Sequence, residues 1–139
     1  MKTNSIIGLV LILIMAISCK DETLEIQQAY TFKLTHLPIP SDVPENGTVE
    51  IRCTLETAGN YKEAIYKIRF FQNEGKGRLF LENMHLSVPN DLYAIEHRNF
   101  RLYYKAESKQ NHQFDVYVED TFGQTEKVSF EFGAQESKN

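Results

Sequence analysis

Two cysteines carry the most reactive side chains in this sequence, and their surroundings differ. Cys19 ends an apolar segment and is followed at once by charged residues. Cys53 lies in the segment 48–56, where apolar and polar residues alternate strictly, so it shares a face with three aliphatic side chains. A reactive thiol needs an accessible, electropositive site. The alternation instead predicts that Cys53 is a small buried hydrophobe with a structural role.

The residues before Cys19 have the layout of a secretory signal peptide over 1–18. Lys2 supplies a positive charge, an apolar run follows from Ile6 to Ile17, and small residues precede the cysteine. That run is shorter than the roughly 20 residues of a spanning helix, so a permanent transmembrane helix is not expected.

The sequence Ala16-Ile17-Ser18-Cys19 resembles a bacterial lipobox. This resemblance implies cleavage before Cys19 and acylation of its sulfur and its new amine. The alternative is a signal peptide that is cut nearby and leaves a free cysteine. If Cys19 is acylated, Cys53 has no partner in the chain, although an even cysteine count in an exported protein normally suggests a disulfide.

Three charged residues, Lys20, Asp21 and Glu22, follow the cysteine at the place where sorting machinery reads a lipoprotein's destination. A basic residue followed by two acidic ones resembles a surface-export signal, which predicts an anchor in the outer membrane. Whether the protein lies on the cell-surface or the periplasmic face of that membrane is left undecided. Residues 19–29 are expected to be the lipidated cysteine and a polar tether. The alternative for the three charged residues is that they belong only to this solvated linker, for which such residues are usual.

The remaining reactive side chains do not form a catalytic or metal-binding pattern. No two of the four histidines have the spacing of a metal motif, and each is expected at the surface or at a strand end: His36, His85, His97 and His112. Carboxylates such as Asp115, Glu119 and Asp120 lie along one strand, where they are usually solvated. We therefore expect no enzyme activity, no metal and no cofactor.

The charge balance limits the partners. The formal net charge is −4 at pH 7, and loss of Lys2 with the signal peptide makes it more negative. Direct binding to nucleic acid needs a cationic surface. This composition therefore argues against nucleic acid as a partner, and the mild acidic excess indicates solubility.

The elements that would position these side chains are strands. Period-two alternation occurs in several segments separated by turn residues, and no amphipathic helix is apparent after residue 19. The predicted strands are 30–35, 48–56, 61–72, 78–81, 99–105, 113–119 and 126–132. About seven antiparallel strands predict an all-β, immunoglobulin-like β-sandwich over 30–132, with a closed barrel as the alternative and 133–139 as a flexible tail.

The penultimate strand offers a candidate partner-binding site. With Phe114 and two valines facing the core, Asp115, Tyr117 and Glu119 point outward. Tyrosine is favoured at recognition surfaces because it presents a large amphipathic area. The alternative is that Tyr117 only covers a neighbouring strand.

Three segments together resemble the TraQ family of conjugative-transposon lipoproteins: residues 89–93 (PNDLY), 100–104 (FRLYY) and 114–124 (FDVYVEDTFGQ). The resemblance covers about residues 30–132, and its third motif is the most specific. It implies an accessory role in a mating apparatus, with the membrane and proteins of that apparatus as partners, and it implies no reaction.

Two functions therefore remain as hypotheses. The chain is an envelope-anchored binding or assembly module of a conjugation apparatus, or it is a surface adhesin or glycan-binding lipoprotein unrelated to DNA transfer.

Overall fold

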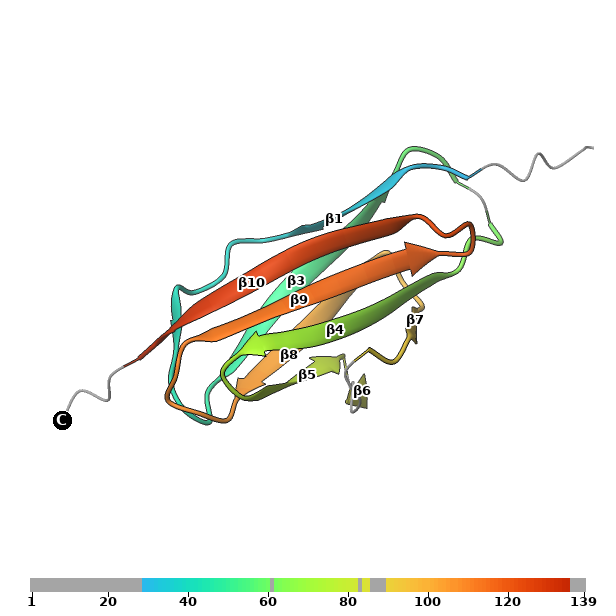
Figure 1. Cartoon of the computed structure of the whole chain (residues 1–139). Helices are drawn as coiled ribbons and strands as arrows, with labels where there is room; N and C mark the ends of the chain where they lie inside the picture. The colour runs from blue at the N-terminus through green and yellow to red at the C-terminus, as the bar shows by residue number, and fades with distance from the viewer. Residues whose placement is uncertain (1–28, 61, 83, 86–89, 136–139) are drawn as a thin grey trace, which may run out of the picture.

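A computed structural model describes residues 29–60, 62–82, 84–85 and 90–135, and these form ten β-strands (Figure 1). The strands are β1 (Phe32–His36), β2 (Asp42–Val43), β3 (Thr48–Thr57), β4 (Tyr66–Glu74), β5 (Gly77–Leu81), β6 (Met84–His85), β7 (Tyr93–Ile95), β8 (Asn99–Ala106), β9 (His112–Asp120) and β10 (Thr125–Ala134). The described residues contain no helix, and thus no helix that could cross a membrane.

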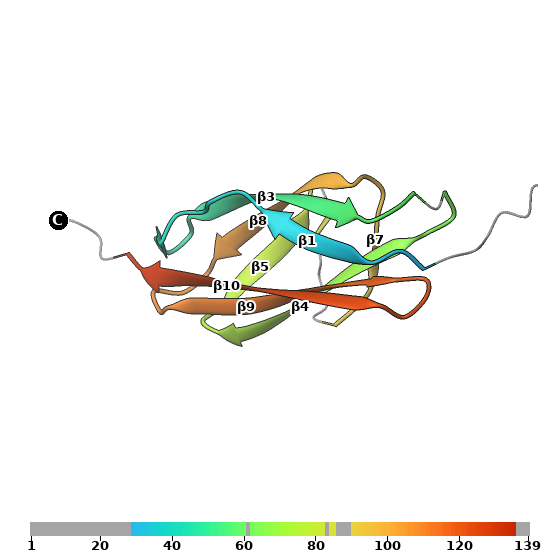
Figure 2. The same cartoon turned by 90° about the horizontal axis from the view of Figure 1, so that it is seen from above.

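The strands form two five-stranded sheets that lie face to face (Figure 2). One sheet has the order β1-β3-β8-β5-β6 and the other β2-β10-β9-β4-β7. All described pairs are antiparallel except that of β2 with β10. The order β1-β3-β8-β5 against β4-β9-β10 reproduces the ABED and CFG sheets of immunoglobulin-like domains. The expected sandwich is confirmed, and the barrel alternative is not adopted.

Alternation determines which side chains enter the core. In β3, four apolar side chains are buried and the polar residues between them lie outside: Val49, Ile51, Cys53 and Leu55 are the buried set. Valine, isoleucine and threonine also suit the extended backbone, because their branched side chains fit a pleated surface. The same pattern buries one face each of β8, β9 and β10.

Aromatic rings fill the space between the sheets. The Phe114 ring, which has no exposed surface, stacks on Tyr104 at a centroid distance of 4.3 Å and on Phe130 at 5.2 Å. Phe132 also stacks on Tyr104, at 5.8 Å, and its ring lies 6.2 Å from that of Phe114. Tyr104 comes from one sheet and the phenylalanines from the other, so this stack joins the two layers.

A buried polar network closes the core at one end. The Nε2 of His112 donates to the carbonyl oxygen of Ser108 at 3.1 Å, and its Nδ1 is hydrogen-bonded with the Tyr104 hydroxyl at 2.7 Å. The Gln72 amide donates to the same hydroxyl oxygen at 2.8 Å. Burial raises the pKa of Tyr104 to about 12, which keeps its donor proton in place. Gly77 is required here because a Cβ would collide with the Tyr104 hydroxyl.

Several strand boundaries differ from those expected. β4 starts at Tyr66 rather than at residue 61, and its register buries Ile68 and Phe70 while Ile65 stays 50% exposed. β10 continues through Gly133 and Ala134 because both pair with β2, two residues beyond the expected end of the domain. The short strands β2, β6 and β7 were not predicted, because two or three residues carry no periodicity.

The buried thiol of Cys53 leads to a direct prediction. Cys53 is a free cysteine, it is 2% exposed, and burial raises its pKa to about 12. In a Cys19→Ser variant, where Cys53 is the remaining thiol, we expect labelling by iodoacetamide to be very slow at pH 8 and fast in denaturant. Because the thiolate is the nucleophile, rapid labelling of the folded protein would contradict the structural role of Cys53.

Candidate functional site

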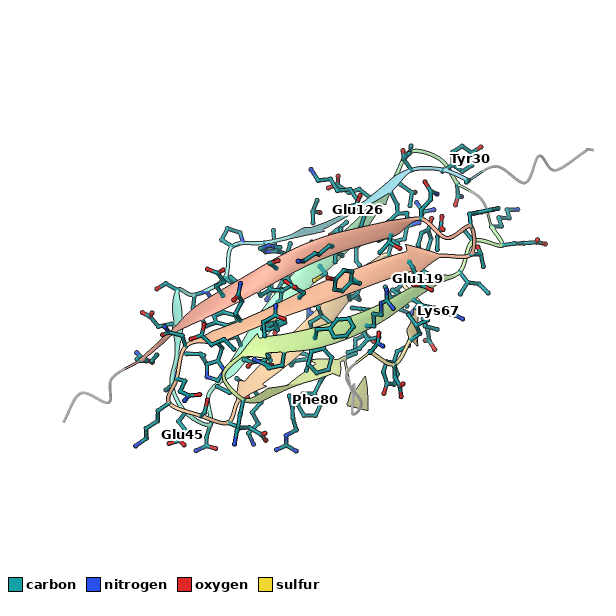
Figure 3. The ribbon with its side chains drawn as sticks, in the orientation of Figure 1. Tyr30, Glu45, Lys67, Phe80, Glu119 and Glu126 are labelled. Atoms are coloured by element: carbon teal, nitrogen blue, oxygen red, sulfur yellow. The ribbon has the colours of Figure 1, made fainter. Side chains whose placement is uncertain are left out.

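The candidate site lies on the outer face of the sheet formed by β10, β9 and β4. In this sheet Tyr117 is the register partner of Lys127 on one side and of Arg69 on the other. Glu119 is paired in the same way with Lys67, and both are labelled on the face turned toward the viewer in Figure 3. Strand pairing therefore places a cationic residue on each side of Tyr117 and one beside Glu119.

Tyr117 is half-buried within a cluster of four side chains, which we call the Tyr117 cluster: Arg69, Phe71, Tyr117 and Lys127. The Phe71 ring meets Tyr117 edge-on at a centroid distance of 5.6 Å. The Arg69 guanidinium lies 5.4 Å from the Tyr117 ring centroid and the Lys127 ammonium 5.8 Å from it. Two cations thus flank one aromatic ring, an arrangement that is attractive because of the ring's negative face.

Asp115 is less accessible to solvent than was expected for a carboxylate on the outer face of a strand. It lies on the outer face but is only 8% exposed, because its register partners Ser129 and Phe71 flank it. The Ser129 hydroxyl donates to Oδ1 at 2.6 Å, and the Lys127 ammonium lies 3.0 Å from Oδ2. Asp115 therefore positions Lys127 rather than offering a free contact.

Glu119 and Arg69 complete this face. The Glu119 carboxylate lies 3.9 Å from an Arg69 terminal nitrogen, and the two side chains are each 30% exposed. The other terminal nitrogen of Arg69 donates to the Asn90 side-chain oxygen at 3.2 Å. Its buried Nε has no hydrogen-bond partner among the described residues. Buried donors are normally satisfied, so the guanidinium retains an unused donor.

The environment of Asp115 predicts a pH dependence of stability. Burial alone would raise the pKa of Asp115, but hydrogen bonds from Ser129, Asn73 and Lys127 together hold it below its usual value. A lowered folded-state pKa gives stability that is complete above the unfolded-state pKa, near 4, and is lost as the pH falls through the folded-state pKa.

We expect Asp115→Asn to lower the free energy of unfolding at pH 7 by about 1.5 kcal/mol, as for a charged hydrogen bond. Below pH 3 the difference from wild type should shrink, because the wild-type carboxyl is then protonated. Urea unfolding at both pH values measures this, with Glu131→Gln on the exposed part of β10 as the control. A difference that does not change with pH would contradict the assignment.

The histidines do not come together. His36 is the last residue of β1, His85 lies in β6, and His97 lies between β7 and β8. The side chains of His36 and His97 are exposed. His112 is at a strand end as expected but is 1% exposed, which was not expected. Its spacing of two from Phe114 was the signal that would have placed it on the core face. Among the described residues, no group of three or more His, Cys, Asp or Glu side chains is arranged to hold a metal ion.

The third carboxylate of this strand, Asp120, has a structural position in the turn between β9 and β10. Its Oδ1 accepts hydrogen bonds from the backbone amides of Phe122 at 2.9 Å and Gln124 at 2.8 Å. The Gln124 side chain donates to Oδ2 at 2.7 Å and to the carbonyl oxygen of Tyr30 at 3.1 Å. Gly123 has φ = 83°, which glycine adopts without strain. Asp120 thus fixes the turn and ties it to the start of the domain.

The residues predicted for anchoring and sorting lie outside the described residues. These are Cys19, Lys20, Asp21 and Glu22, together with the whole predicted signal peptide. The described part of the chain begins at residue 29, just before β1.

Comparison with known proteins identifies the family. The family described as TraQ conjugal transfer protein matches residues 2–135. The chain belongs to the TraQ family. A search of curated proteins gives no match.

Three solved structures are similar to this chain in sequence and fold. A conjugative transposon lipoprotein from Bacteroides eggerthii is 41% identical, with a TM-score of 0.70 over 75% of this chain and 98% of that one. A lipoprotein from Bacteroides thetaiotaomicron is 38% identical, with a TM-score of 0.69 over 84% and 89%. A conjugate transposon protein from Bacteroides vulgatus is 33% identical, with a TM-score of 0.67 over 85% and 96%.

The third TraQ-like motif, residues 114–124, now has a physical explanation. Phe114 anchors the interlayer aromatic stack, Tyr117 centres the outer cluster, and Asp120 with Gln124 builds the turn. This short segment therefore contributes residues to the core, to the Tyr117 cluster on the outer face and to the turn between β9 and β10.

Proposed function

We propose that this TraQ-family chain is a lipoprotein anchored to the outer membrane through Cys19, and that it acts as a protein-binding or assembly module of a conjugative transposon's transfer apparatus. Family membership over residues 2–135 carries the proposal. The lipobox resemblance and the relatives described as lipoproteins support the anchor. Binding rather than catalysis is the proposed role.

The Tyr117 cluster is the surface that we propose for the partner. Its tyrosine, phenylalanine and arginine side chains are of the types enriched where proteins bind each other. The cluster lies on the central strands of a sheet, so the backbone beneath it is held on both sides by β10 and β4. The Lys127 side chain, which is 49% exposed, and the Arg69 side chain, which is 30% exposed, favour a partner that presents carbonyl or carboxylate oxygens.

Site-specific photo-cross-linking in cells tests this proposal. A photoreactive phenylalanine analogue replaces Tyr117 in one strain and, as the matched control, the exposed Lys33 on the other sheet in a second strain. Each variant is expressed in cells that carry the transposon and in isogenic cells that lack it. The analogue keeps an aromatic ring at position 117, so the fold should be preserved.

We expect a cross-linked adduct at position 117 that contains a transposon-encoded protein and is absent from transposon-free cells. Equal adducts at both positions, or adducts that do not depend on the transposon, would contradict the proposal. Adducts with polysaccharide instead would support the adhesin or glycan-binding alternative.

A further inference from the structure

One end of the sandwich, which we call the tether end, carries exposed apolar side chains beside the point where the chain enters the domain. The turn between β9 and β10 projects there with Phe122, which is 41% exposed. Ile65, which is 50% exposed, precedes Tyr66, and Tyr66 is the register partner of Asp120 at the base of that turn. The two apolar side chains therefore belong to the same end of one sheet.

The entry point of the chain is held against this turn. The Gln124 side chain donates to the carbonyl oxygen of Tyr30, and the Tyr30 ring packs so closely on Gly59 that a Cβ there would collide with it. Figure 1 shows the start of β1 at the same end of the sandwich as the β9–β10 turn, opposite the end at which β10 finishes. In Figure 3 Tyr30 and Glu45 mark the two opposite ends.

The length of the tether restricts how the domain can face the bilayer. Only residues 20–29 separate the predicted lipidated Cys19 from Tyr30. Such a segment spans at most about 35 Å when fully extended and about 20 Å as a flexible coil. The nine residues of β9 alone run about 30 Å along the sandwich. The tether end is therefore the part of the domain held nearest the membrane.

We propose that the tether end is a membrane-contacting surface, with Phe122 and Ile65 entering the interfacial region of the bilayer so that the sandwich stands end-on. This inference rests on the lipid anchor of the proposed function. The Asp120 hydrogen bonds fix the backbone on both sides of Phe122, so the side chain is presented without a large ordering cost. End-on orientation leaves the Tyr117 cluster, on the long side of the sandwich, open to a protein partner.

Apolar contact rather than charge carries the interaction. The exposed charges at this end are mixed, with Lys62 and Arg98 against Glu63 and Glu96. Apolar side chains on an anchored surface partition into the interface in proportion to their buried area. The contact is therefore expected to persist at high salt, where electrostatic attraction is screened.

Tryptophan fluorescence provides the test, because the chain contains no tryptophan. The lipidated full-length mature protein is reconstituted into vesicles of phosphatidylethanolamine and phosphatidylglycerol, with and without brominated acyl chains. The Phe122→Trp variant reports on the tether end, and Ile65→Trp is a second reporter should the first fail to fold. Lys109→Trp, whose side chain is 82% exposed in the β8–β9 loop at the opposite end, is the control.

We expect the brominated lipids to quench the Phe122→Trp and Ile65→Trp variants in both low and high salt, and to leave Lys109→Trp unchanged. Vesicle flotation separates a failure of the membrane contact from a failure of the lipid anchor. Protein that floats with the vesicles but shows no quenching at either tether-end position overturns the membrane contact and leaves the anchor intact. Equal quenching at both ends overturns the end-on orientation. Protein that does not float overturns the anchor and, with it, this inference.

Discussion

Replacing Phe114 by alanine is expected to lower the free energy of unfolding by about 3–5 kcal/mol. The Phe114 ring is fully buried and stacks on Tyr104 from the opposing sheet and on Phe130 from the neighbouring strand. Its removal leaves a cavity at the junction of the two layers, where the sheets can collapse only partly. Because domains are stable by about 5–15 kcal/mol, this one change should remove a large part of the total.

Urea unfolding followed by circular dichroism measures this loss. Phe122→Ala is the matched control, since the same side chain is removed from a position that is 41% exposed, and surface changes usually alter stability by about 0.5 kcal/mol. A loss for Phe114→Ala no larger than that of the control would contradict the interlayer stack as the centre of the core.

Replacing Cys19 by serine is expected to abolish lipidation and to move the protein from the membrane fraction to an unprocessed or soluble form. Serine lacks the sulfur that the lipobox resemblance assigns as the acylated atom. The variant should therefore remain an unprocessed precursor or become a soluble form. Intact-mass analysis and membrane fractionation measure both effects.

The second cysteine provides the control for this change. Cys53→Ala removes a buried thiol from β3 but leaves the residues around Cys19 unaltered. Its mass should still include the acyl groups, and it should still fractionate with membranes. If Cys19→Ser had the wild-type modification and partitioning, the chain would not be a lipoprotein anchored at this residue.

The sequence predicted those parts of the fold that depend on local alternation. β3, β8, β9 and β10 are long enough for period-two patterns to assign their buried faces. β7 has three residues and β6 two, and both exist because they pair with a neighbouring strand's edge. Such pairing is a property of the whole sheet, so no local pattern could reveal it.

The candidate site was predictable only in its central strand. Alternation placed Asp115, Tyr117 and Glu119 on one face, but their environment depends on which residues of β4 and β10 lie beside them. That register brings Arg69 and Lys127 to the Tyr117 ring and covers Asp115 with Ser129 and Phe71. Alternation within one sequence indicates where the strands lie, but it does not indicate the register in which neighbouring strands pair.

The frequency of transposon transfer tests the central claim most directly. A donor strain lacking this gene is complemented with wild type, with Cys19→Ser or with Cys53→Ala, at matched protein levels, and mated with a recipient. We predict that deletion sharply reduces transfer, that wild type and Cys53→Ala restore it, and that Cys19→Ser does not. Transfer that is unaffected by the deletion would contradict a role in conjugation, and full rescue by Cys19→Ser would contradict the anchored form as the active one.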